Sequence, residues 1–497
     1  MNKIFKVLST TLLATCAMTA QAAQFCVGDA AGLAAALNIA DNNGQDDVVL
    51  IQQGTITGNF IYNANVAEAG DLELRGGYDT SCITSSDVAA DTVIDGGGVA
   101  RTLTLSGRDN SSLDVTGLTV TGGLAQDQGG GLDIDRWLSV QLLNNRVVGN
   151  DAVAGLGGTA GVEIDRSINV AVERNLFSGN TGEDGGGLSI SDMDIATVRA
   201  NRFVGNSAAD GGGGADLTSE GIILMANNLF EGNSSLQDGG AMSVRIESIG
   251  SAGLLQIVNN TVVNNQAAQD GGGAELNLNG DATRMLLLNN IFWNNTAVRG
   301  ADLSIDNDDD DNGVAATTDL ETNDFNHTFF VGFFSQLPIP ISPSNFNAVD
   351  PLFSGVSDFS LSPGSPLVDA GTSAAPGVSS LDLDGAPRVQ GPAIDLGALE
   401  TGSDADGDGV ADAQDNCTLR ANPDQRDSNG DGFGNVCDAD LNNDGIVNVV
   451  DLGLLRVAFF SADADADFNG DGVVNTIDLG AMRSLFLMPP GPSGVAL

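Results

Sequence analysis

Apolar and polar residues alternate along many short segments of the chain, as in Leu132-Asp-Ile-Asp135 and Ala274-Glu-Leu-Asn-Leu278. A period of two residues predicts β-strands with one inward face, because successive side chains of a strand point to opposite sides. Gly, Asn or Asp bounds each segment, and these residues tolerate the positive φ of sharp corners. The pattern therefore predicts many short strands joined by tight turns.

One motif recurs six times between Asn144 and Leu303: an Asn, an apolar residue two positions later, then Gly-Asn or Asn-Asn. Self-similarity at a period of 26 to 32 residues predicts a solenoid, in which each strand pairs in parallel with its copy in the next coil. The repeated Asn side chains are expected to stack inside a corner and to hydrogen-bond from coil to coil. The six copies begin at Asn145, Asn175, Asn201, Asn228, Asn260 and Asn290.

These repeats resemble the right-handed parallel β-helix superfamily, which includes pectin lyase-like folds, and the Asn-x-Phe-x-Gly-Asn motif is similar to that of its secreted, surface-associated members. The resemblance implies an all-β, single-stranded parallel β-helix over residues 46–304. Before it, residues 29–40 predict a helix with Asp29 as its cap and Leu33, Leu37 and Ala40 on one face. Within an N-terminal cap of residues 24–45, this helix would cover the open apolar end of the solenoid.

Composition agrees with a narrow solenoid, since the 497 residues include 66 glycines and only 5% aromatic residues. The formal net charge is −47, and the only lysines, Lys3 and Lys6, lie near the N-terminus. So acidic a chain is a poor partner for nucleic acid or anionic membranes and a good one for divalent cations.

Residues 1–23 resemble a secretory signal peptide, with Lys3 and Lys6 before an apolar run and Ala20-Gln-Ala22 as a cleavage site. This leader predicts export to the cell surface or medium. A lipoprotein modified at Cys16 is the alternative, and no later segment is long and apolar enough to span a membrane.

Four cysteines remain after cleavage of the leader, which predicts two local disulfides, Cys26–Cys82 and Cys417–Cys437. Zinc is not expected, because C-x-x-C is absent and His327 is the single histidine.

After Leu303 the repeat stops. Residues 306–311 form an acidic run, for which a solvated loop is the main interpretation and a weak cation site the alternative. The Pro-rich segments from Asp350-Pro-Leu-Phe353 to Asp395-Leu-Gly-Ala-Leu-Glu400 resemble the choice-of-anchor region of bacterial extracellular β-helices. That resemblance implies that residues 305–402 close the solenoid and precede an attachment device.

Four acidic loops follow with identical spacing. Oxygen-bearing side chains occupy positions 1, 3, 5, 9 and 12, and position 6 is always Gly (Gly409, Gly432, Gly445, Gly472). This is the ligand spacing of an EF-hand calcium loop, in which position 7 contributes its backbone carbonyl. Asp replaces Glu at position 12, so weak, extracellular-type affinity is expected. The predicted calcium ligands are Asp404, Asp406, Asp408, Val410, Asp412 and Asp415; Asp427, Asn429, Asp431, Phe433, Asn435 and Asp438; Asp440, Asn442, Asp444, Ile446, Asn448 and Asp451; and Asp467, Asn469, Asp471, Val473, Asn475 and Asp478.

The first two loops, with Asp415-Asn-Cys417 and Cys437-Asp438, resemble a thrombospondin type 3 repeat over residues 403–439, although Thr418 stands where the family has Pro. The last two loops each lead into a predicted amphipathic helix, residues 449–460 and 476–487. This arrangement resembles a type I dockerin over residues 440–488, before a flexible tail of residues 489–497. Dockerins bind a cohesin partner, although Val449-Val450 departs from their usual hydroxyl pair. The implied partner-binding residues are Val449, Val450, Arg456, Thr476, Ile477 and Arg483.

Some parallel β-helices cleave polysaccharides, so the resemblance also implies an enzyme as an alternative. A polygalacturonase-like site is excluded, because it requires Gly-His-Gly and Arg-x-Lys, which this chain lacks. A lyase could use Arg as base beside calcium-binding Asp residues, but charged residues on these strands are expected to be the solvated face. These residues are Asp133, Asp135, Arg136, Asp165, Arg166, Asp192 and Asp194.

The sequence therefore predicts a secreted calcium-binding surface protein for adhesion or glycan contact, tethered through its dockerin-like module. Whether it is an enzyme stays open. The alternatives are a polysaccharide lyase or hydrolase acting on acidic polysaccharide, and a structural surface-layer component.

Overall fold

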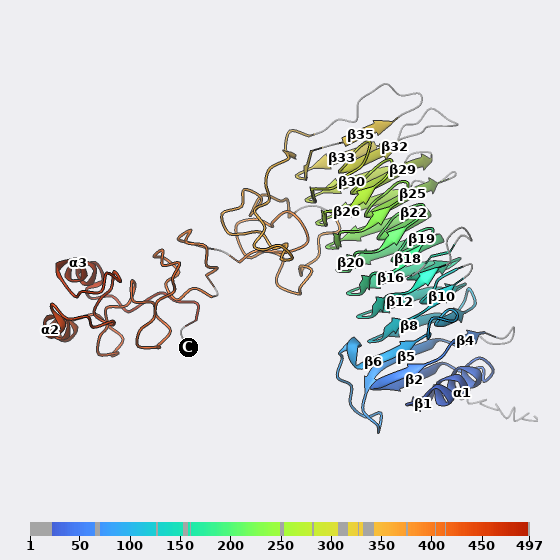
Figure 1. Cartoon of the computed structure of the whole chain (residues 1–497), viewed down its shortest axis with the longest axis horizontal. Helices are drawn as coiled ribbons and strands as arrows, with labels where there is room; N and C mark the ends of the chain where they lie inside the picture. The colour runs from blue at the N-terminus through green and yellow to red at the C-terminus, as the bar shows by residue number, and fades with distance from the viewer. Residues whose placement is uncertain are drawn as a thin grey trace, which may run out of the picture.

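The computed structural model describes residues 22–64, 70–125, 128–152, 158–159, 161–248, 253–280, 283–306, 317–326, 328–331, 342–373, 376–402, 404–412 and 414–495. Nearly all of the predicted leader, residues 307–311 of the acidic run, His327 and the last two residues of the tail lie outside this set. A column of stacked strands forms most of the described chain, and an irregular segment ending in two helices extends from its side (Figure 1).

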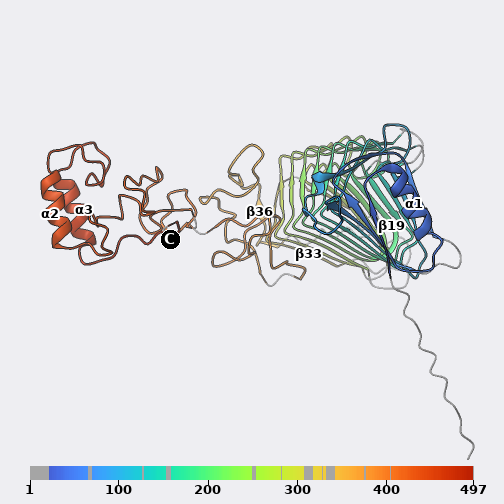
Figure 2. The same cartoon turned by 90° about the horizontal axis from the view of Figure 1, so that it is seen from below.

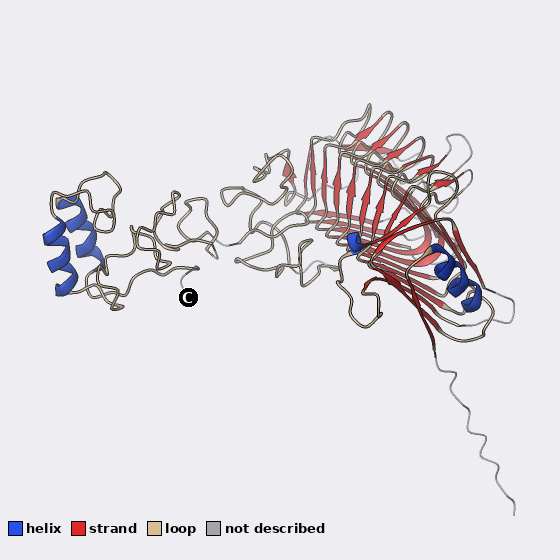
Figure 3. Ribbon diagram, turned by 60° about the horizontal axis from the view of Figure 1, so that its bottom comes forward, coloured by secondary structure: helices blue, strands red, loops and turns tan. Residues whose placement is uncertain are grey.

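The strands form a parallel β-solenoid, as the alternation predicts. One face of the coils is a ladder of parallel strands, which Figure 3 shows stacked edge to edge. It consists of β1 (Ala23–Val27), β2 (Asp47–Gln52), β5 (Leu72–Tyr78), β8 (Ser112–Thr116), β12 (Ser139–Leu143), β16 (Asn169–Glu173), β19 (Leu188–Arg199), β22 (Ala215–Ala226), β26 (Leu254–Val258), β30 (Arg284–Leu288) and β33 (Thr317–Glu321).

A second ladder belongs to the same 19-stranded sheet, because the 12-residue strands β19 and β22 run through both ladders. It contains β4 (Phe60–Asn63), β7 (Leu103–Ser106), β11 (Leu132–Asp135), β15 (Val162–Asp165), β25 (Met242–Ser248), β29 (Ala274–Gly280), β32 (Leu303–Asp306) and β35 (Thr328–Val331), together with the first halves of β19 and β22.

The remaining two faces are separate sheets. The 11-stranded sheet consists of β3 (Gly54–Thr57), β6 (Thr92–Asp95), β9 (Thr119–Thr121), β13 (Arg146–Val148), β17 (Leu176–Ser178), β20 (Arg202–Val204), β23 (Leu229–Glu231), β27 (Thr261–Val263), β31 (Ile291–Trp293), β34 (Asp324–Phe325) and β36 (Phe346–Asn347). The six-stranded sheet consists of β10 (Leu124–Ala125), β14 (Asp151–Ala152), β18 (Thr181–Gly182), β21 (Ser207–Ala208), β24 (Ser234–Ser235) and β28 (Gln266–Ala267). Parallel pairing thus continues beyond residue 304, the predicted end of the solenoid.

Equivalent apolar residues stack inside the solenoid. Ile134 pairs in register with Ile164, which pairs with Ile190, and all three are at most 1% exposed. The rings of Phe177, Phe203 and Phe230 in the repeated motif stack with centroids 4.8 and 4.5 Å apart. Coil-to-coil repetition of one side chain therefore builds the core.

The repeated asparagines stack inside the corners, as predicted, and they form two separate ladders. In each step, the side-chain oxygen of one Asn accepts the backbone N–H and the amide N–H of its equivalent one coil earlier, as from Asn180 to Asn206 (3.1 and 2.9 Å). The ladder that starts at Asn145 also extends past the six motifs to Asn323 and Asn345. These bonds satisfy polar groups that the corners bury.

The predicted N-terminal helix is α1 (Ala30–Ala40), and the Asp29 side chain accepts the Gly32 N–H at 2.7 Å. Its buried face packs on β1, β2 and β4. Figure 2 shows α1 at the N-terminal end of the solenoid. The Cys26–Cys82 disulfide is present and joins β1 to the loop after β5. A 3₁₀ turn, η1 (Ala89–Asp91), precedes β6.

The described part of residues 342–402 is irregular except for β36 and lies against the outer surface of the coils. Its Leu383, Ala398 and Leu399 pack on the outward Leu229 and Val263 of the 11-stranded sheet. Leu361, Leu367 and Leu396 pack on Ile291 farther along the same sheet. We call this segment the strap, because it covers several coils from the side.

Candidate calcium-binding site

Each of the four acidic loops wraps around the carboxylate at its first position. Asp404 Oδ1 accepts the Gly407 N–H at 2.8 Å and Asp404 Oδ2 accepts the Gly409 N–H at 2.9 Å. In the other three loops, the first-position carboxylate likewise accepts the N–H of the sixth-position Gly. Asp427 accepts from Gly432 at 2.9 Å, Asp440 accepts from Gly445 at 2.6 Å, and Asp467 accepts from Gly472 at 2.8 Å. The sixth residue has φ between 87° and 95° in all four loops, which explains why it is always Gly.

Positions 3 and 5 repeat their contacts as well. The carboxylate at position 5 accepts the N–H of position 7, and in the first loop Val410 donates to Asp408 at 2.9 Å. The side chain at position 3 accepts the N–H of position 5, and there Asp408 donates to Asp406 at 3.2 Å. The other three loops contain the same two bonds at 2.9 to 3.2 Å. One chain geometry therefore recurs in all four loops.

The first loop shows most directly that these residues fit a cation. Carboxylate oxygens of Asp404, Asp406 and Asp408 lie within 4.8 Å of one another. Asp406 Oδ2 and Asp415 Oδ2 are buried and have no hydrogen-bond partner. Burial raises the pKa of Asp406, and the nearby Asp408, Asp415 and Asp404 carboxylates raise it further. Carboxylate oxygens that converge from positions 1, 3 and 5, with unpaired oxygens at positions 3 and 12, are the kind of donor that Ca²⁺ prefers.

The loops divide into two pairs by the way they close. In the first pair, the ninth side chain accepts the N–H of position 2: Asp412 from Ala405 (3.0 Å) and Asn435 from Ser428 (2.8 Å). In the second pair, the twelfth residue becomes the third residue of a helix and accepts the N–H of position 9, as from Asn448 to Asp451 at 2.7 Å. The equivalent bond from Asn475 to Asp478 is 2.8 Å. The change in the way the loops close falls between Asp438 and Asp440.

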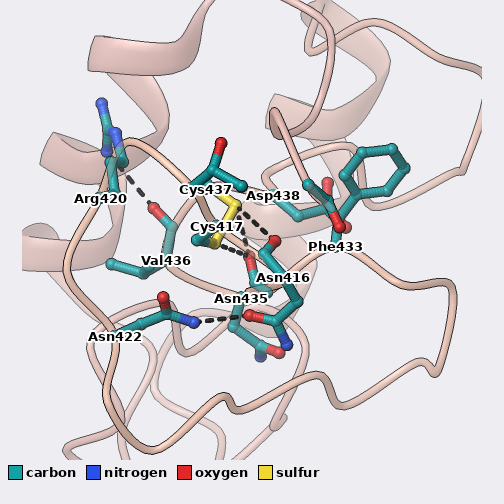
Figure 4. Close-up of a disulfide and its surroundings, with 12 residues drawn as sticks. Asn416, Cys417, Arg420, Asn422, Phe433, Asn435, Val436, Cys437 and Asp438 are labelled. Carbon is teal, nitrogen blue, oxygen red and sulfur yellow. Dashed lines mark hydrogen bonds between the residues drawn. A yellow bond between two sulfur atoms is a disulfide. The ribbon is translucent and has the colours of Figure 1, made fainter. Parts of the chain in front are cut away.

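The Cys417–Cys437 disulfide is present and fully buried between the first two loops (Figure 4). Asn416, beside it, donates to Gln425 O at 3.0 Å, and Gln425 Nε2 donates to the twelfth-position Asp415 at 2.8 Å. Burial raises the pKa of Asp438, which follows the second cysteine, to about 7. Gln425 was not predicted, because it lies between two loops and belongs to neither spacing.

The two predicted helices are α2 (Val449–Ala458) and α3 (Thr476–Leu485), each two residues shorter than expected. Leu455, Met482 and Leu485 form a small buried core with Val447 and Val474. All six residues implied as partner-binding are exposed: Val449, Val450, Arg456, Thr476, Ile477 and Arg483. Among the described residues, none of the helices is long and apolar enough to cross a bilayer.

Comparison with known proteins identifies part of this region. The thrombospondin type 3 repeat family matches residues 402–425 and 426–452, and this repeat is a calcium-binding motif. No curated protein and no solved structure shows a significant match to the chain. The second match includes the third loop, residues 440–451, which the sequence resemblance had placed in the dockerin-like module. Neither the dockerin nor the choice-of-anchor resemblance gains support from these comparisons.

The matches define a calcium-binding, extracellular-type segment. It is joined to an all-β parallel solenoid, and the two disulfides agree with an oxidising, extracellular setting.

The charged residues of the candidate lyase site are not all solvated. Asp133 and Asp135 are only 6% and 9% exposed, so the prediction of a solvated face is wrong for these two. Arg101 pairs with Asp133 at 2.8 Å, and Arg166 bridges Asp135 and Asp165 at 2.8 and 2.9 Å. Ion pairing explains how these carboxylates are buried. Arg136 also pairs with Asp135, whereas Asp192 and Asp194 are exposed.

A polar groove of about 430 Å³ lies over β15, β19, β22, β25 and β29, beside the glycine-rich corners. Glu163 and Asp216 stand on one register column with Ser189 between them. Burial raises the pKa of both carboxyls to about 7. Further carboxylates and one guanidinium line the groove: Asp184, Asp210, Asp238, Glu275 and Arg245. The alternation of apolar and polar residues predicts that these side chains point outward, but it does not predict that they line one groove.

Proposed function

We propose that the chain is a secreted calcium-binding surface protein in which a rigid β-solenoid is carried by a calcium-ordered C-terminal segment. The observation that supports this best is the first loop, where three carboxylates converge and Asp406 and Asp415 retain buried oxygens without partners. Calcium would satisfy those oxygens and neutralise the repulsion among the carboxylates. The matched thrombospondin repeats support the same chemistry.

Calcium would act as a structural ion here. Residues 404–478 contain four acidic loops, and their apolar core is confined to the small cluster around α2 and α3. So little apolar burial cannot hold these carboxylates together unless cations offset their repulsion. In this proposal, calcium occupancy holds the segment extended and keeps the solenoid at a fixed distance from its anchor.

The exposed Val449, Val450 and Ile477 support attachment through the second pair of loops, since they leave apolar surface at the start of both helices. They are 72%, 51% and 57% exposed. A cohesin-like protein of the same surface is the partner that the dockerin resemblance implies. The solenoid would then serve adhesion or glycan contact.

Limited proteolysis of the full chain with calcium and with EDTA tests the structural role of the ion. We expect EDTA to expose residues 404–487 to cleavage while the far-UV circular dichroism of the solenoid stays unchanged. Asp404→Asn and Asp406→Asn together should make the first loop sensitive even with calcium present. Asp384→Asn in the strap is a matched control that removes an exposed carboxylate outside the loops. A C-terminal segment that resists protease equally in EDTA would refute the proposal.

The polar groove supports a second candidate, a polysaccharide-cleaving enzyme. Carboxyl groups with a pKa of about 7 suit general acid catalysis at neutral pH, and Arg245 lies among them. Incubation with acidic polysaccharides tests this through absorbance at 235 nm for lyase products and through reducing ends for hydrolysis. Activity lost in Asp216→Asn would support the enzyme, and no product from any substrate would remove it.

A further inference from the structure

A second hollow, a cleft of about 790 Å³, lies on the opposite side of the coils from the glycine-rich corners. Its floor is the corner between the first strand ladder and the 11-stranded sheet. Its walls are residues 87–90 and residues 379–385 of the strap. Asn144 Nδ2 donates to Asp87 O at 3.0 Å and Asn227 Nδ2 to Leu381 O at 2.7 Å, so both walls are fastened to the corner.

Four arginines line this cleft in a chain that has 19 basic residues against 66 acidic ones. Arg146 begins β13 and Arg202 begins β20, and both are in register with Leu176 of the coil between them. Arg174 stands at the corner of that middle coil, and Arg199 ends β19. Three consecutive coils therefore bring four guanidinium groups to one hollow.

Two of these arginines already have carboxylate partners, and two do not. Arg199 pairs with Glu173 through two contacts of 2.9 and 3.0 Å, and Arg202 pairs with Asp384 of the strap. Arg146 and Arg174 are exposed, and their side chains have no hydrogen bond or ion pair within the described part of the chain. Elsewhere on the coils, exposed arginines such as Arg75 and Arg284 pair with acidic neighbours. In so acidic a protein, two unpaired guanidiniums facing a cleft indicate an anionic ligand.

The cleft walls narrow the chemistry of that ligand. A guanidinium binds a carboxylate or sulfate through two parallel hydrogen bonds. Glu173 and Asp384 also line the cleft, and together with the net charge of −47 they repel a ligand with closely spaced phosphates. The same carboxylates accept hydrogen bonds from hydroxyl groups. A ligand with many hydroxyls and widely spaced carboxylates satisfies both conditions.

We propose that this cleft binds a short segment of a carboxylated polysaccharide, with Arg146 and Arg174 holding its uronate groups. Adjacent coils lie about 4.8 Å apart, so the two guanidiniums, one coil apart, can reach the same short segment. A hollow of 790 Å³ is in the usual range for small-ligand sites. This inference rests on the glycan contact proposed above and is independent of the calcium loops.

Isothermal titration of the full chain with a short oligogalacturonate tests the proposal. We expect binding that weakens by about tenfold or more in Arg146→Gln/Arg174→Gln, because two charge-assisted contacts are lost. The control is Arg75→Gln/Arg284→Gln, which removes the same charge from two exposed solenoid arginines outside the cleft and should leave affinity within about twofold. Circular dichroism checks that both variants keep the solenoid.

Four results would overturn the proposal. Equal weakening in both double variants would show that only long-range charge matters, and equal binding of a neutral galactose oligomer would show that the arginines do not select the ligand. Inorganic sulfate that competes as strongly as the oligogalacturonate would reduce the cleft to a simple anion site. A calcium titration of the same sample distinguishes the polysaccharide proposal from the calcium proposal. A chain that binds calcium but no oligogalacturonate would refute only the proposal that the cleft binds a carboxylated polysaccharide.

Discussion

Replacement of Asn206 by Ala tests the ladder of buried amides in the solenoid. Asn206 is 1% exposed, and its side chain makes four hydrogen bonds. Its Oδ1 accepts the Asn180 backbone and amide N–H groups at 3.1 and 2.9 Å, and its Nδ2 donates to Phe177 O and Asn233 Oδ1, each at 3.0 Å.

Alanine removes all four bonds and leaves the Asn180 backbone N–H buried without its side-chain acceptor. An orphaned buried group costs about 1–3 kcal/mol, and the lost amide bonds add roughly 1 kcal/mol more, so about 2–4 kcal/mol is expected for Asn206→Ala. Asn169→Ala is the matched control, because its amide is partly exposed and makes one long bond of 3.3 Å to Leu138 O. Its expected cost is below about 1 kcal/mol.

Hydrogen exchange is the appropriate assay, since a repeat array can open locally and a single global transition need not report the damage. Asn206→Ala should lower the protection of amides in the coils of Asn180 and Asn206 far more than Asn169→Ala lowers it in its own coil. Equal loss of protection in the two variants would mean that the buried amides stabilise the coils no more than surface amides do, which would refute this prediction.

Two further perturbations address the C-terminal disulfide and the acidic groove. Cys417→Ser/Cys437→Ser removes a crosslink between residues 20 positions apart in the sequence. The free energy of unfolding of the C-terminal segment, measured with denaturant, should decrease by about 3 kcal/mol. An unchanged free energy of unfolding would contradict this prediction. Burial raises the pKa of Glu163 and Asp216 to about 7, so the folded state holds protons that the unfolded chain releases at lower pH. These two groups should therefore stabilise the solenoid most below about pH 4, and their contribution should be lost as the pH rises through 7. Glu163→Gln/Asp216→Asn should reduce the dependence of solenoid stability on pH over this range, and an unchanged dependence in this variant would contradict the prediction.

The sequence predicted those parts of the fold that repeat. The strands and both asparagine ladders follow from one motif, and the helix cap at Asp29 follows from local hydrogen bonding. The ladder members Asn323 and Asn345 were missed, because they lack the Gly-Asn or Asn-Asn that ends each motif. The calcium loops were recognisable because all ligands of one loop lie within twelve residues of sequence.

The cleft and the groove were not predictable by the same means. Arg202 and Asp384 meet across 182 residues, and no local pattern connects the strap with the coil that it covers. Asp133 and Asp135 were expected to be solvated, because alternation shows which side chains point outward but not whether a neighbouring group covers them. Tertiary proximity decides both cases.

The strap also limits how the molecule can change in length. Each added coil would lengthen the stack by about 4.8 Å without disturbing its neighbours, as in other repeat proteins. The strap, however, contacts fixed positions from Arg202 to Phe325, so a coil duplicated inside that interval would displace these contact residues relative to one another. Longer or shorter versions of this protein are therefore most easily made by gaining or losing coils ahead of Arg202.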